Sequence, residues 1–158
     1  MRKTLKILHT LSAIGMSGGL AAYMLVLATT PEITSLEAHA SLRASLALVA
    51  KWMILPSMLV VIVTGLLAMA VHDRFQEMPW VWIKALSGIL IFEATLASVD
   101  GPAQQAAAAT ARAVAGDIDI ATMQSLLRDE WGAWWMLLAL SVANVLLAIW
   151  RPRFNLKP

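Results

Sequence analysis

The chain has 158 residues, of which 59% are hydrophobic and only 14% are charged, and its formal net charge is +2. A soluble domain carries about 25% charged residues, so this composition excludes a soluble domain with one small core and predicts a surface covered by lipid. The absence of cysteine excludes disulfides, iron–sulfur clusters and thiolate metal sites. The sequence has no basic run with interleaved aromatic residues, so no nucleic-acid partner is expected.

Four apolar stretches divide the chain. Their approximate limits are residues 7–28, 46–71, 80–98 and 131–150. Each is close to the roughly 20 residues that a helix needs to cross about 30 Å of hydrocarbon, and a helix satisfies its own backbone hydrogen bonds in lipid. The sequence therefore predicts an all-α fold in which residues 1–158 form one integral membrane domain, a bundle of four transmembrane helices.

The first stretch has a second interpretation, as a signal peptide whose charged start is Met1-Arg2-Lys3. The apolar part of a signal peptide usually has about 7–15 residues. The stretch in this chain is longer, which favours a transmembrane span.

Two segments between the spans are predicted to be helical. Residues 31–50 carry leucines at helical spacing and follow Thr30, a candidate N-cap. Residues 102–115 are rich in alanine, and Gly116 breaks this helix. Asp119 can then cap a helix that runs on into the fourth span. These segments predict a small helical cap on the outer face of the bundle.

Basic residues are unevenly distributed between the two ends of the spans. The richer side has Arg2, Lys3, Lys6, Arg74, Arg151, Arg153 and Lys157. The Lys/Arg-rich side of a membrane protein is cytoplasmic, so we expect a multi-pass protein of the bacterial plasma membrane with both termini in the cytoplasm. Trp131, Trp134 and Trp135 are predicted to anchor the fourth span at the outer interface.

Two polar residues lie at matching depth on the predicted cytoplasmic side. His9 is about one turn inside the first span, and Lys84 is about one turn inside the third. Polar groups in a membrane are costly, so each needs a role. His9 is either a ligand of haem iron or another metal, or a histidine that is hydrogen-bonded within the bundle. Lys84 either pairs with an anionic group, such as a porphyrin propionate or an anionic substrate, or extends to the nearby interface.

Two further residues are candidates for a second ligand. His72 ends the second span on the same side as His9. An exposed interfacial histidine is the favoured interpretation of His72, and a ligand from a neighbouring helix is the alternative. Met16 shares a helical face with His9. It is either a ligand or, like the other scattered methionines, a residue that fills gaps in the core.

Lys51 and Glu93 carry opposite charges in the outer halves of the second and third spans. Glu93 cannot pair with Lys84, because nine residues place the two on opposite faces of one helix. We expect an ion pair between Lys51 and Glu93, since pairing lowers the cost of burying both charges.

Short motifs in three spans resemble a known family. They are Leu5-Lys6-Ile7-Leu8-His9, Thr64-Gly65-Leu66 and Trp82-Ile83-Lys84-Ala85-Leu86. The chain resembles the HemJ-type protoporphyrinogen oxidases and related CopD-like four-helix membrane proteins over most of the spans, but not over the outer segments. The resemblance implies that His9 binds haem b and that Lys84 is essential for activity.

These features predict a small membrane protein that binds haem b and has a redox-linked role. One alternative is a non-enzymatic subunit that packs in a homo-oligomer or a larger membrane complex. Another is a copper-handling protein, suggested by the CopD-like resemblance and the nine scattered methionines. No nucleophile, base and orienting group occur as a set, so hydrolytic chemistry is not expected.

Overall fold

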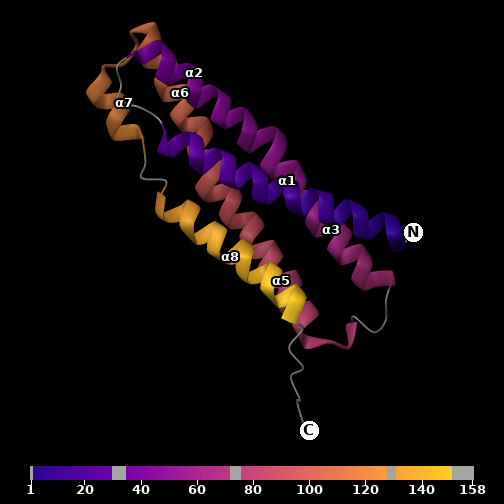
Figure 1. Cartoon of the computed structure of the whole chain (residues 1–158). Helices are drawn as coiled ribbons and strands as arrows, with labels where there is room; N and C mark the ends of the chain where they lie inside the picture. Colours follow the sequence, from indigo (N-terminus) through magenta and orange to yellow (C-terminus); the bar gives the residue numbers. More distant parts are fainter. Residues whose placement is uncertain (1, 30–34, 72–75, 128–130, 151–158) are drawn as a thin grey trace.

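The protein is described by a computed structural model that covers residues 2–29, 35–71, 76–127 and 131–150 and is almost entirely helical over them (Figure 1). The elements in chain order are α1 (Arg2–Ala28), α2 (Leu36–Val49), η1 (Ala50–Ile54), α3 (Leu55–Val71), α5 (Pro79–Thr95), η2 (Leu96–Asp100), α6 (Gly101–Ala115), α7 (Ile120–Leu126) and α8 (Trp131–Trp150). Four helices are long and apolar enough to cross a membrane. The predicted all-α fold with four transmembrane helices is therefore confirmed.

The second and third membrane helices are each continuous through a short π-helical segment. In η1 the Leu55 N–H donates to the Ala50 carbonyl, and in η2 the Gly101 N–H donates to the Leu96 carbonyl. A proline follows two residues after each segment, at positions 56 and 102. Proline has no N–H and its ring crowds the preceding turn of a helix, and the wider π turn accommodates this. Proline inside a helix commonly produces a kink, and here a π turn precedes Pro56.

These continuous helices are longer than a membrane is thick. Leu36–Val71 has 36 residues and Pro79–Ala115 has 37. At about 1.5 Å per residue each extends about 54 Å, against about 30 Å of hydrocarbon. The helix predicted over residues 31–50 begins at Leu36 in the described residues and continues without a break into the second span.

The parts beyond the membrane form the predicted helical cap. Here α2 packs along α6, with small buried side chains between them, namely Ala47, Ala50, Ala103, Ala106, Ala109 and Ala113. Polar side chains, such as Glu37, Ser41, Gln105 and Arg112, are exposed on this pair together with small alanines. These polar side chains suit water rather than lipid, which fits a cap at the end of the bundle.

The ends of the cap helices differ in part from the prediction. Ser35 is the N-cap of α2, while the predicted cap Thr30 lies outside the described residues. Gly116 ends α6 in a left-handed conformation with φ of 81°, as its position predicted. The Asp119 carboxylate accepts a hydrogen bond from the Thr122 N–H at 2.9 Å, and hydrogen bonding to Thr122 lowers the pKa of this carboxyl from its ordinary value.

The helix that Asp119 caps does not run into the fourth span. It ends at Leu126 because Leu127 adopts an extended conformation, and α8 begins at Trp131. The prediction of one continuous helix from Asp119 into the fourth span was therefore wrong.

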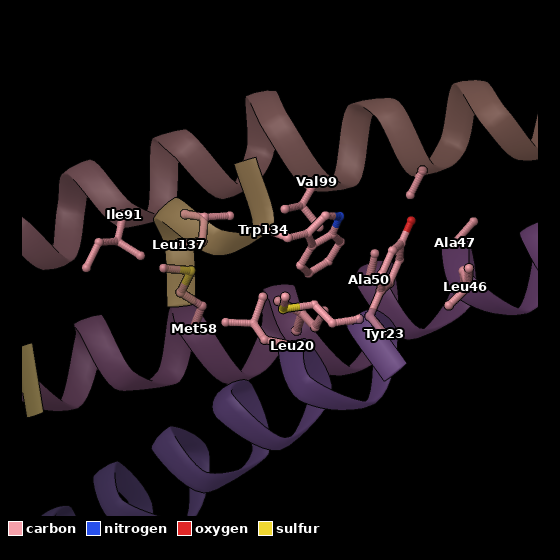
Figure 2. Packing of buried hydrophobic residues seen from close by; sticks show 13 residues of the cluster. Leu20, Tyr23, Leu46, Ala47, Ala50, Met58, Ile91, Val99, Trp134 and Leu137 are labelled. Atoms are coloured by element: carbon pink, nitrogen blue, oxygen red, sulfur yellow. The ribbon is translucent and has the colours of Figure 1, made fainter. Parts of the chain in front are cut away.

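An aromatic pair packs in the core of the bundle on the side of the cap. The rings of Tyr23 and Trp134 stack with centroids 4.0 Å apart and an interplanar angle of 26°, and the two residues are 1% and 0% exposed. Figure 2 shows them among the buried apolar side chains of the membrane helices. Trp134 was predicted to be an interfacial anchor. It is a core residue instead, because Trp134, Leu137 and Ser141 form the buried stripe of α8, whereas Trp131 and Trp135 lie on its exposed side.

Close approach of α1 to α3 depends on glycines. A Cβ atom at Gly15 would lie 2.9 Å from Ser57 Oγ, and one at Gly19 would lie 3.0 Å from Ile54 Cγ1. A Cβ at Gly18 would meet nothing within 4 Å. Gly15 and Gly19 therefore set the spacing of the two helices, as small residues do in membrane bundles, and this spacing brings His9 onto α3.

Candidate functional site

The imidazole of His9 lies against α3. Its Nδ1 is 3.0 Å from the hydroxyl oxygen of Thr64. A Cβ atom at position 65 would be 3.6 Å from His9 Cε1, so Gly65 leaves the space in which the ring rests. Thr64 and Gly65 together hold His9 in one orientation.

The hydrogen bonds of Thr64 determine which nitrogen of the His9 ring carries the lone pair. The Thr64 hydroxyl donates to the Val60 carbonyl at 2.6 Å, with the Val61 carbonyl at 3.2 Å. A hydroxyl has one proton, and with that proton given to the backbone the Thr64 oxygen accepts from His9 Nδ1–H. The neutral imidazole then keeps a lone pair on Nε2. A second residue that fixes the tautomer in this way is typical of histidines that bind metals.

His9 and Lys84 line the same cleft. The cleft has a volume of about 640 Å³, and its walls come from α1, α3 and α5, with Asn144 contributed by α8. In Figure 1 the α1–α3 pair and the α5–α8 pair separate towards the end of the bundle where α1 begins and α8 ends. His9 and Lys84, which were predicted to lie at matching depth, line one cleft. This volume is in the range of small-molecule sites, about 300–1,000 Å³.

The cleft has an apolar wall and a positive lining. Lys3, Lys6 and Lys84 line it, and no Asp or Glu does so among the residues that the structure describes. The small residues Gly65, Ala68, Ala85 and Gly88 contribute part of its wall. Such a lining suits a flat apolar group that carries anionic substituents.

A smaller cavity of about 70 Å³ continues from the cleft into the bundle. His9, Lys84 and Asn144 line both spaces. Met16 and Ser141 line only the smaller one. Met16 is therefore beside the cleft and not in it, and the methionine that does line the cleft is Met69, which the sequence did not single out. His72 lies outside the described residues.

Lys51 and Glu93 do not form the predicted ion pair. Both side chains are exposed, and the described part of the chain contains no ion pair between them. Lys51 lies 5.9 Å from the ring centroid of its neighbour Trp52. Glu93 lies on the exposed face of α5 together with Leu86 and Leu90, because other residues occupy the buried face of that helix.

The residues present suit a prosthetic group better than a bare metal ion. Within the described ranges, no three His, Cys, Asp or Glu side chains gather as a metal site. One histidine with a free lone pair beside a lysine fits the needs of haem, which takes its equatorial ligands from the porphyrin and only axial ligands from protein.

Thr64 is the site residue to which sequence reasoning gave no role, whereas Asn144 is polar and lies within a predicted span, and Gly65 belongs to one of the quoted motifs. The pair Thr64-Gly65 in an otherwise apolar helix is the signal that could have found the support for His9. Comparison with known protein families, curated proteins and solved structures found no match for this chain.

Proposed function

We propose that this protein binds haem b in the cleft, with His9 as an axial ligand, and that it has a redox-linked role in the membrane like that of the HemJ-type oxidases it resembles. The observation that carries the proposal is the contact of His9 Nδ1 with the Thr64 hydroxyl at 3.0 Å, which leaves Nε2 as the ring nitrogen for a ligand, beside Lys84 in one cleft. Haem supplies electron transfer or oxidative chemistry, depending on its axial ligands and surroundings.

The chain's own residues have distinct tasks in this proposal. His9 would hold the iron and Thr64 would fix the ring of His9. The Lys84 ammonium would neutralise a propionate, as a charge-assisted pair in an apolar setting does. The apolar wall would lie against the body of the group. Met69 lines the cleft and would be a candidate second ligand.

The proposed setting is the bacterial plasma membrane, with the basic termini in the cytoplasm. The start of α1, the end of α3, the start of α5 and the end of α8 all lie at one end of the bundle. Most of the Lys and Arg residues are in the segments at that end, and the positive-inside rule supports the orientation. The cleft would then face the cytoplasm.

The test is haem binding by the purified protein in detergent. We expect a Soret band in the wild type, its loss in His9→Ala, and its retention in His39→Ala. His39 is the matched control because it lies in α2, in the cap. An unchanged Soret band in His9→Ala, or a wild type that stays colourless with haem in excess, would refute the proposal.

A second candidate function is that of a structural subunit, and Glu93 favours it. Its carboxyl group is exposed on an otherwise apolar stripe of α5, where contact with lipid is costly. A second copy or a larger complex would cover it. A colourless protein that co-purifies with a fixed partner, and loses it on Glu93→Leu, would support this function. Copper handling has no comparable support among the described residues.

A further inference from the structure

Two buried polar atoms on α8 have no hydrogen-bond partner in the described part of the chain. They are Ser141 Oγ and Asn144 Oδ1. Ser141 is only 5% exposed, and a spacing of three residues puts both on one face of α8. A buried polar atom without a partner costs about 1–3 kcal/mol. Each of the two atoms therefore needs a hydrogen-bond partner that the described side chains do not supply.

Ser141 and Asn144 both line the smaller cavity beside His9. Its volume is about 70 Å³, and a cavity needs only about 10–15 Å³ of this kind to hold one water molecule. Its lining offers a hydroxyl from Ser141, an amide from Asn144 and an ammonium from Lys84. Most of the lining is apolar, so these three polar residues are the places where water would be held.

The cavity adjoins the cleft on one side and the apolar core of the bundle on the other. Towards the end of the bundle with the termini it shares His9, Lys84 and Asn144 with the cleft, and Lys3 and Lys6 line the cleft further out. On the opposite side lie side chains with 0–4% exposure, namely Leu20, Tyr23, Ile54, Met58, Ile91, Trp134 and Leu137. Figure 2 shows these layers of apolar side chains.

We infer that the cleft and the smaller cavity form one water-filled vestibule, which is entered only from the end with the termini and stops at Ser141. Ser141 and Asn144 bind water at its blind end. The lysines on its wall, with no acidic side chain among the described lining residues, make it a space that favours anions over cations. The inference depends on the two cavities and not on haem, so it holds whichever ligand enters.

The natural absence of cysteine allows a direct test. Ser141→Cys and Asn144→Cys proteins, made under haem depletion so that haem cannot block the cleft, are treated in sealed vesicles with membrane-impermeant methanethiosulfonates. Leu137→Cys is the matched control, one turn away and 0% exposed. Asn155→Cys and Gln105→Cys report which end of the bundle each side of the vesicle presents.

We expect Ser141→Cys and Asn144→Cys to react only from the side that labels Asn155→Cys, and Leu137→Cys not to react from either side. Electrostatic focusing should make an anionic sulfonate reagent react about tenfold or more faster than a cationic trimethylammonium reagent. Labelling from the Gln105→Cys side, equal labelling of Leu137→Cys, or no labelling of either α8 cysteine by any reagent would overturn the vestibule. A preference for the cationic reagent would overturn its selectivity.

Discussion

At the scale of single residues, the site depends on the two hydrogen-bond partners of one threonine, a backbone carbonyl and a histidine. Thr64 gives its proton to the Val60 carbonyl at 2.6 Å and presents its oxygen to His9 at 3.0 Å. The depth of His9 and Lys84 was predictable from their positions in the spans. The role of Thr64 was not, because a threonine hydroxyl in a helix commonly bonds to its own backbone, and only the packing of α1 on α3 shows that it also meets a histidine.

Replacing Thr64 tests this pair of hydrogen bonds. Valine has the shape of threonine but no acceptor for His9 Nδ1, so Thr64→Val should free the ring orientation and weaken haem binding by about 10–100-fold, as loss of an orienting partner does. Haem titration of the purified protein measures this. Thr64→Ser keeps the hydroxyl and should bind haem nearly as well as the wild type. Equal affinity in Thr64→Val and wild type would show that the threonine does not position His9.

At the scale of helices, hydropathy was sufficient for the four spans but not for their details. A stretch as apolar as residues 55–71 has few soluble alternatives. The π turns could not be predicted, because proline in a membrane helix can be accommodated by a kink, a π turn or a partner side chain. The core position of Trp134 was missed because a tryptophan near a membrane boundary suits both the interface and the bundle core, and only the stripe it shares with Leu137 decides between them.

Adjacent glycines on α1 give a matched prediction about helix packing. Gly19→Val should push α1 from α3, because even its Cβ would lie 3.0 Å from Ile54 Cγ1. Overpacking of this kind costs about 1–3 kcal/mol. Gly18→Val adds the same group where no atom lies within 4 Å and should leave the free energy of unfolding nearly unchanged. Denaturation in detergent measures both, and a greater loss for Gly18→Val would contradict this account of the interface.

At the scale of the whole molecule, the sequence could not determine how each helix is rotated about its own axis. Lys51 and Glu93 were expected to meet because both lie in the outer half of the bundle. Depth does not fix the direction in which a side chain points, and each of these two points away from the bundle core. The same limit did not affect His9 and Lys84, because both lie on the inner faces of their helices and line one cleft.

Orientation in the membrane is a prediction for the whole molecule. We expect Gln105→Cys in intact cells to react with a membrane-impermeant maleimide and Asn155→Cys to react only after the cells are opened. The reason is the excess of Lys and Arg in the segments at the end of the bundle with the termini. Gln105 is exposed on α6, so its cysteine is accessible in the folded protein. The reverse pattern would mean that the cleft opens to the outside.

The two charged residues of α5 also bear on how the protein enters the membrane during synthesis. A charged residue at the centre of a helix opposes insertion by about 2.5–3.5 kcal/mol, whereas each Val, Ile, Leu or Phe favours it by about 0.3–0.6 kcal/mol. Helix α5 contains two charged residues, Lys84 and Glu93, and only seven Val, Ile, Leu or Phe residues, whereas α3 contains no charged residue. The third span is therefore less favourable to insert than the second. Because α3 and α5 are in contact in the folded protein, we expect the second and third spans to enter the bilayer together as a hairpin.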